Sequence, residues 1–157
     1  MPAGVSGTLN FTFCETENFT MPKALLHLCE AQTSLKGRTI LQDSKLRAQS
    51  LDFAVEIIKL VKNLKSQHET VISNQIGRSG TSIGANIHEA QYAHGKADFI
   101  AKLQIALKEA NETGYWLQLL FKTNYIDEQE YKKLDSACTS LRVMLISSIN
   151  TVKENNL

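Results

Sequence analysis

The sequence predicts an all-α protein, with an antiparallel up-down-up-down four-helix bundle over residues 43–157. Three observations lead to this fold class. Apolar residues recur at alternating steps of three and four in four successive stretches, which is the spacing of one buried helix face. Short polar connections separate the stretches, and such connections make neighbouring helices antiparallel. No proline interrupts residues 43–157.

Residues 1–42 differ from the rest of the chain. Gly, Thr, Ser and Asn are scattered through them without a sustained period, which predicts a loosely ordered leader. A short apolar run at 24–31 predicts one or two helical turns that dock on the bundle. Met21 is an alternative start of the chain. The predicted organisation is therefore a leader over 1–42 and a bundle domain over 43–157.

The first helix is predicted to begin at Asp43, and the second follows within residues 72–90. The buried face of the first helix is predicted to consist of Leu46, Ser50, Phe53, Ile57, Leu60 and Leu64. The corresponding face of the second helix consists of Ile72, Ile76, Gly80, Ile83, Ile87 and Ala90.

The third and fourth helices repeat the same spacing. The third is the most regular, with a face made of Phe99, Leu103, Ala106, Ala110, Thr113, Leu117 and Leu120. The fourth has a face made of Leu134, Cys138, Leu141, Leu145, Ser148 and Val152. Asp127 and Glu130 form the pattern of a capping box, so the fourth helix should start near Glu128. Residues 94–98 and 123–125 are the predicted connections around the third helix.

The stretch RSGTSIGANIHEAQ, residues 78–91, is rich in small residues and raises the question of a phosphate-binding loop. It matches neither the Walker pattern nor GxGxxG, and the helical spacing continues through it. Gly80 and Gly84 therefore indicate a groove against which a neighbouring helix packs closely. Close approach of a ligand or of an RNA backbone is the alternative.

Polar residues in the same stretch give no catalytic or metal-binding pattern. Asn86 and Glu89 lie three apart on one helical side, where a hydrogen-bonded structural network explains them better than acid–base chemistry. His88 and His94 are six apart, and the HExxH pattern is absent. The sequence predicts no enzyme, no metal site and no cofactor.

The composition narrows the possible functions and the possible cellular location of the protein. A formal charge of +1 is far from the balance of a strongly basic nucleic-acid-binding protein, so such binding requires a local patch or repetition in an oligomer. Cys14, Cys29 and Cys138 are too few and too widely spaced for a disulfide framework or a CxxC site. No apolar run has the length of a membrane span. We expect a soluble, cytoplasmic protein with no membrane contact.

The third helix has more apolar surface than one buried face uses. The residues that we predict to contact another subunit are Ile100, Leu107, Trp116 and Phe121. A helix that is apolar nearly all round is either central in its fold or covered by another subunit. Self-association is the prediction, and coverage by the leader is the alternative.

Two stretches resemble a known family. Residues 78–91 resemble the signature of bacterial four-helix-bundle proteins encoded in intervening sequences of 23S ribosomal RNA genes, and residues 96–120 resemble their third helix. The resemblance covers about residues 43–150, with Ala90 and Gly114 as departures from the usual pattern. The matching signature positions are Arg78, Ser79, Ser82, Ile83, Asn86, Ile87 and Glu89. The resemblance implies a small homo-oligomeric bundle, pentameric in its relatives. The chain is also similar to accessory proteins of diversity-generating retroelements, which implies binding to nucleic acid and to a reverse transcriptase.

Two functions remain open from the sequence. The first is a non-enzymatic scaffold that binds structured RNA or other nucleic acid, with a candidate basic surface made of Lys45, Arg47, Lys59, Lys62, Lys65 and Arg78. An ordinary solvated face explains these charges equally well. The second is an adaptor that binds an unidentified protein through the third helix and the leader.

Overall fold

The computed structural model describes residues 39–154, so the predicted leader lies outside the described residues as far as residue 38. Side chains are described from Lys45 onwards. The described part consists of four helices and contains no strand, which confirms the predicted all-α class. The helices are α2 (Thr39–Ser66), α3 (Val71–Ala90), α4 (Lys96–Lys122) and α5 (Glu128–Glu154). The first helix thus begins four residues before its predicted start.

The four predicted faces form the core. Every residue of the four series is buried except Ile72 and Phe99, which are partly buried and pack against the core. Each large apolar side chain removed from water in this way stabilises the fold by roughly 1.5–3 kcal/mol. Ile126 and Ile149 are also buried, although the periodic series did not include them.

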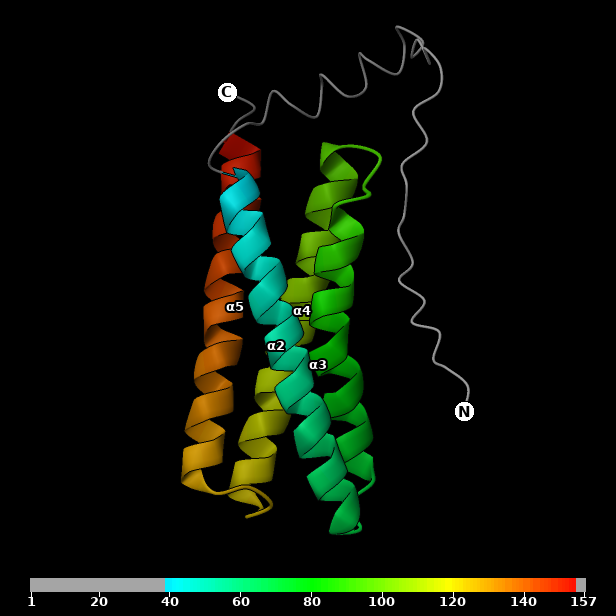
Figure 1. Ribbon diagram of the computed structural model, residues 1–157, viewed down its shortest axis with the longest axis vertical. Helices are drawn as coiled ribbons and strands as arrows, with labels where there is room; N and C mark the ends of the chain where they lie inside the picture. The colour runs from blue at the N-terminus through cyan, green and yellow to red at the C-terminus, as the bar shows by residue number, and fades with distance from the viewer. Residues whose placement is uncertain (1–38, 155–157) are drawn as a thin grey trace, which may run out of the picture. The chain divides into compact units, whose positions relative to one another are not determined.

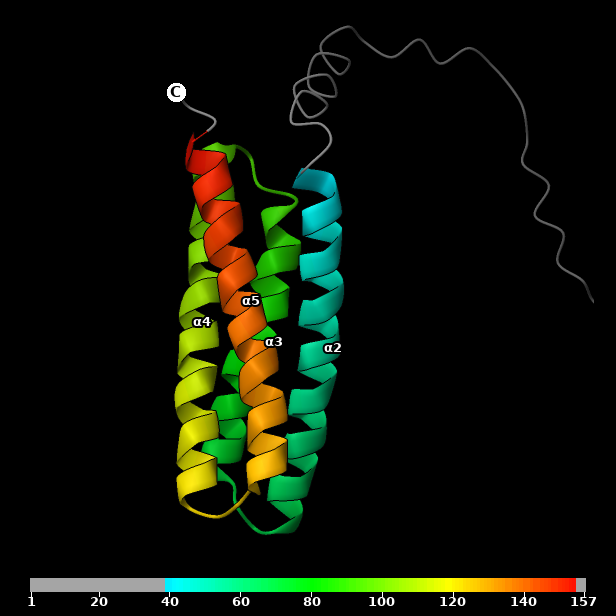
Figure 2. The same cartoon turned by 90° about the vertical axis from the view of Figure 1, so that its left-hand side faces the viewer.

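The helices run alongside one another, as Figures 1 and 2 show from two directions. α2 packs on α3 and α5, and α4 also packs on α3 and α5. Each helix therefore has two neighbours, and this packing is consistent with a bundle. None of the described helices is both long and apolar enough to cross a membrane.

The small residues of α3 allow close contact with α2. A Cβ atom built on Gly80 would lie 2.9 Å from two side-chain carbons of Ile57, and one on Gly84 would lie 3.5 Å from the Ser50 hydroxyl oxygen. The space in front of Gly80 is therefore already filled by α2. This confirms that the Gly80-x-x-x-Gly84 pattern is a helix-packing feature.

Acidic side chains satisfy free amides where two helices begin. The Glu69 carboxylate accepts hydrogen bonds from the backbone amides of Ile72 (2.8 Å) and Ser73 (2.7 Å) at the start of α3. Asp127 accepts from the amide of Glu130 (2.8 Å) at the start of α5, which confirms its predicted capping role. In the predicted connection that precedes α5, Asn124 has a positive φ of 58°.

Candidate functional site

Three signature residues of α3, Arg78, Ser79 and Glu89, contact α4. Ile83 and Ile87 are core residues, and Ser79 is fully buried. Across the contact, the Thr113 hydroxyl oxygen is 3.0 Å from the Ser79 hydroxyl oxygen and donates to the Glu109 carbonyl oxygen at 2.8 Å. A buried hydroxyl needs such partners because its desolvation is costly. This part of the signature therefore holds two helices together.

Two ion pairs lie on the exposed side of the same contact. Arg78 on α3 donates to Glu112 on α4 at 2.9 Å. Lys102 on α4 donates to Glu89 on α3 at 2.6 Å, and this hydrogen bond raises the pKa of the Lys102 ammonium. Asn86 donates to the carbonyl oxygen of Ser82 at 2.8 Å within α3. Glu89 and Asn86 thus each have a partner, but the two do not form the one network that the sequence predicted, and Glu89 is exposed.

Two buried polar atoms near this region have no hydrogen-bond partner among residues 39–154. They are the Ser73 hydroxyl oxygen and Oε2 of Glu109. A single carboxylate oxygen of this kind does not make a catalytic arrangement, which needs a second acid, base or metal within reach. Within the described part of the chain, no three His, Cys, Asp or Glu side chains are placed to hold a metal ion.

The thiol of Cys138 is buried and donates to the carbonyl oxygen of Ala110 at 3.2 Å. Burial raises the pKa of this thiol to about 11. A thiol with such a pKa is almost entirely protonated at neutral pH and is therefore a poor nucleophile. Cys138 acts as a core residue, whereas Cys14 and Cys29 lie outside the described residues.

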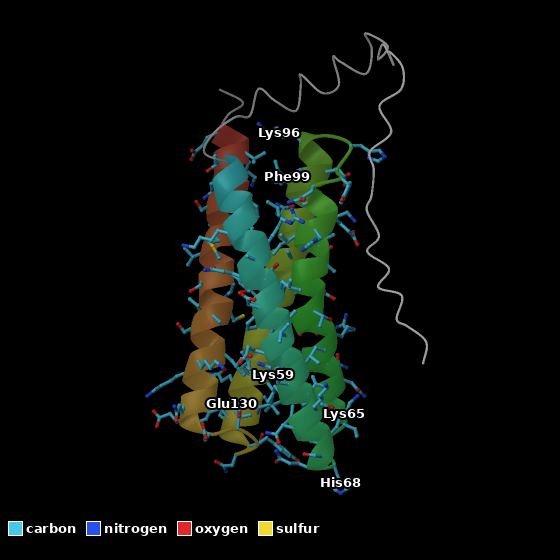
Figure 3. The ribbon with its side chains drawn as sticks, in the orientation of Figure 1. Lys59, Lys65, His68, Lys96, Phe99 and Glu130 are labelled. Carbon is cyan, nitrogen blue, oxygen red and sulfur yellow. The ribbon has the colours of Figure 1, made fainter. Side chains whose placement is uncertain are left out.

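The predicted basic surface is divided between the two ends of α2, with Lys45 and Arg47 near its start and the three lysines near its end, while Arg78 lies on α3. Arg47 and Lys59 are twelve residues apart, which corresponds to about 18 Å along a helix axis. Lys59 and Lys65 lie at the same end of the described helices as His68, and Lys96 lies at the other end (Figure 3). Arg47 instead borders a cavity of about 10 Å³ that is otherwise lined mainly by apolar side chains. Such a volume holds about one water molecule.

Ion pairs occupy part of this basic surface. Lys59 donates to Glu56 at 2.6 Å, and Lys133 on α5 donates to the other oxygen of the same carboxylate. Lys133 and then Lys59 lower the pKa of Glu56 to about 2. Arg78 is paired with Glu112, as described above. Lys62 and Lys65 are exposed, and within residues 39–154 neither has an ion-pair partner.

The predicted subunit-contact residues Ile100, Leu107, Trp116 and Phe121 are partly buried and pack against the core of their own chain. The Phe121 ring stacks on Tyr131 with 4.8 Å between ring centroids. The Trp116 indole donates to Glu112 at 3.2 Å. These side chains therefore contribute to the stability of the single chain.

Large apolar side chains are exposed on all four helices, with Val71 on α3, Ile105 and Tyr115 on α4, and further ones on α2 and α5. Leu51, Val55 and Ile58 are exposed on α2, and Val143 and Ile146 are exposed on α5. The sequence reasoning passed over these positions because they interleave with the core series. These residues are spaced by steps of four and three residues on α2 and of three residues on α5. This spacing was visible in the sequence and would have allowed them to be predicted.

Comparisons with known proteins agree with this architecture. A solved structure described as a protein with unknown function from the S23 ribosomal protein family of Bacteroides thetaiotaomicron VPI-5482 is 53% identical, with a TM-score of 0.68. The match covers 69% of this chain and 98% of that one. None of the curated proteins compared with the chain matches it.

The family described as 23S rRNA-intervening sequence protein matches residues 42–147, which includes most of all four helices. Neither this description nor that of the solved structure names an enzymatic activity. The signature that holds α3 on α4 lies entirely within the matched region. The chain belongs to the 23S rRNA-intervening sequence protein family.

Proposed function

We propose that the chain is a non-enzymatic scaffold that assembles with copies of itself. The observation that carries this proposal is the exposed apolar surface on neighbouring helices, with Leu51, Val55 and Ile58 on α2 and Val143 and Ile146 on α5. Apolar residues gathered on an outer face are typical of protein–protein contacts. The resemblance in the signature stretch favours a ring of five subunits.

The subunit of this assembly is proposed to be an up-down-up-down bundle. The connections support this topology, because residues 67–70, 91–95 and 123–127 are each too short to carry the chain back along a helix. In Figure 1 the colour changes in opposite directions along successive helices, which also supports it.

The mass of the assembled protein in solution tests self-association. We expect light scattering during size-exclusion chromatography to give a mass well above the 17.5 kDa of one chain. Val143→Glu should lower this mass, because Val143 is 62% exposed and a carboxylate there would have to lose its hydration in a contact. Ala85→Glu, at an exposed position on α3, is the matched control. A mass of one chain at every concentration would contradict the proposal.

Nucleic-acid binding is a second candidate function, favoured by the exposed lysines near the end of α2. Lys62 and Lys65 have no carboxylate partner within the described residues, and assembly would repeat this pair in every subunit. The family description, which refers to 23S rRNA, is compatible with such a role. We infer that the assembled lysines bind phosphate groups of structured RNA.

Fluorescence anisotropy with structured RNA, single-stranded DNA and duplex DNA at two salt concentrations tests this candidate. We expect salt-sensitive binding that Lys62→Glu/Lys65→Glu weakens strongly. Lys108→Glu/Lys153→Glu reverses two exposed lysines on other helices and serves as the matched control. Absence of binding at low salt would leave the protein–protein adaptor as the function of the assembly.

A further inference from the structure

The side of α4 that borders α3 carries a carboxylate without an ion-pair partner among the described residues. On this side Glu112 pairs with Arg78, and Lys102 pairs with Glu89. Glu109 lies between these two contacts, three residues before Glu112, and therefore projects from the same side of the helix. Its Oε2 atom is buried and has no hydrogen-bond partner within residues 39–154. A carboxylate in such a place favours a cationic partner from another molecule.

The side of α5 that borders α4 carries a cation without a carboxylate partner. Arg142 donates to Asn111 of α4 at 3.5 Å and to Thr139 of its own helix at 2.7 Å. Both partners are neutral, and none of the ion pairs found within residues 39–154 includes Arg142. A guanidinium has five N–H groups, so donors remain for a carboxylate of another molecule.

Glu109 and Arg142 lie at nearly the same height along the bundle, because Arg142 contacts Asn111, which is two residues from Glu109 on α4. An exposed isoleucine lies one turn from each charge. Ile105 (40% exposed) lies four residues before Glu109 on α4. Ile146 (47% exposed) lies four residues after Arg142 on α5. In the proposed antiparallel bundle these two steps run in the same direction, so the two isoleucines also share one height.

A rotation about an axis parallel to the bundle brings these two sides of different copies together. Such a rotation keeps every residue at its own height. Each copy then uses two different sides, which is the heterologous kind of contact that generates rings. Because each described helix has two neighbours, the α3–α4 side and the α4–α5 side of the bundle meet at roughly a right angle. A ring needs about 90° between its two contact sides for four copies and about 108° for five.

We propose that the α3 side of α4 in one copy binds the α4 side of α5 in the next copy. Glu109 of the first copy pairs with Arg142 of the second. Ile105 of the first packs on Ile146 of the second, so the ion pair borders an apolar contact. The inference rests on the proposed self-association and names the two surfaces that join its subunits.

A third pair of residues fits the same alignment at the end of the contact. Asp98 lies seven residues before Ile105, Lys153 lies seven residues after Ile146, and both charged residues are exposed. Asp98 already accepts a hydrogen bond from the His94 amide at 3.1 Å. An exposed ion pair at the edge of a contact contributes little, so the central pair determines the alignment.

Cysteines placed at the two isoleucine positions test the contact in the full chain. Cys14→Ser/Cys29→Ser gives a background whose remaining thiol, Cys138, is buried. In this background, Ile105→Cys and Ile146→Cys chains that are mixed and mildly oxidised should form a disulfide-linked pair on a non-reducing gel. Neither variant alone should do so, because a heterologous contact brings position 105 to position 146 and not to itself.

The control mixture replaces Ile105→Cys by Ala85→Cys, at an exposed position on α3, and should give no linked pair. A linked pair that forms from one variant alone, or equally in the control mixture, would contradict the proposed alignment.

Reversal and restoration of the charges provide a second test. Glu109→Arg and Arg142→Glu should each weaken association on the order of tenfold, because each places like charges opposite one another. Glu109→Arg/Arg142→Glu restores opposite charges and should associate nearly as well as the unaltered protein. Sedimentation velocity over a range of concentrations measures association, and circular dichroism verifies that each variant keeps its helices. Asp52→Arg, an exposed reversal on α2, should have little effect.

The outcomes separate this inference from the proposed function. If the mixture gives no linked pair and the double reversal is no stronger than the single ones, this contact is wrong. If the unaltered protein assembles and Val143→Glu lowers its mass in that case, the scaffold stands without this contact. An unaltered protein that stays at the mass of one chain overturns both.

Discussion

The methyl group of an alanine at position 80 would occupy space that Ile57 already fills. A Cβ at Gly80 lies 2.9 Å from two carbons of this fully buried side chain, whereas at Gly114 the nearest atom is 3.9 Å away, at the end of Arg142. We expect Gly80→Ala to lower the free energy of unfolding by about 1–3 kcal/mol, because overpacking outweighs the gain in helix propensity. Gly114→Ala should raise it by up to about 1 kcal/mol. Urea denaturation measures both, and equal effects would contradict the close α2–α3 contact.

The Glu56 carboxylate provides a pH-dependent link between α2 and α5. Hydrogen bonds from Lys133 and Lys59 lower its pKa from 4.5 to about 2. Because the folded-state pKa is depressed, the stabilisation is present above pH 4.5 and is lost as the pH falls towards 2. A carbon NMR titration of the carboxylate should give a midpoint well below 4.5. Glu56→Gln should remove the part of the acid dependence of unfolding that this carboxylate contributes. An NMR titration midpoint of Glu56 near 4.5 would contradict the paired geometry.

These residue contacts were only partly predictable. The chain spacing of Asp127 and Glu130 was sufficient to place the start of α5, because a cap is a local feature. The partners of Arg78 and Glu56 were not visible, because Glu112 and Lys133 lie 34 and 77 residues away. The predicted basic surface therefore included Arg78, which pairs with Glu112 on another helix, and Lys59, which pairs with Glu56 on its own helix.

At the scale of the helices, the contact between α3 and α4 depends on a buried pair of hydroxyl groups. Ser79 and Thr113 are both fully buried, and their oxygens are 3.0 Å apart. We expect a double-mutant cycle with Ser79→Ala and Thr113→Val to give a coupling energy of about 0.5–1.5 kcal/mol. The control cycle pairs Ser79→Ala with Cys138→Ala, whose thiol bonds to Ala110 instead. Additive effects of Ser79→Ala and Thr113→Val would show that the two hydroxyl groups do not cooperate.

Periodicity located the inner faces of all four helices because burial imposes one repeating spacing on each of them. It did not locate the exposed apolar residues of α2. Leu51, Val55 and Ile58 follow the same spacing as the core residues, so two apolar series overlap in one helix. The sequence instead drew attention to α4, where Trp116 and Phe121 belong to the periphery of the chain's own core. Only the three-dimensional arrangement separates an apolar residue that a neighbouring helix covers from one that remains exposed.

For the whole molecule, the same sequence must provide a stable subunit and surfaces that other molecules recognise. The signature of α3 serves the subunit, since Ser79, Ile83 and Ile87 are buried, Arg78 and Glu89 pair with α4, and Asn86 bonds within α3. The exposed apolar residues of α2 and α5 are not used in this way. Neither are Lys62 and Lys65, which have no ion-pair partner among the described residues. We therefore place the proposed contacts with other copies and with nucleic acid on these surfaces.

Native mass spectrometry of the full chain tests self-association most directly. The scaffold account predicts assemblies whose masses are whole-number multiples of 17.5 kDa, with a five-subunit species if the ring implied by the family resemblance forms. The distribution should shift towards smaller species in Val143→Glu and remain unchanged in Ala85→Glu. A single species of 17.5 kDa at all concentrations, with intact helical structure, would contradict the central claim.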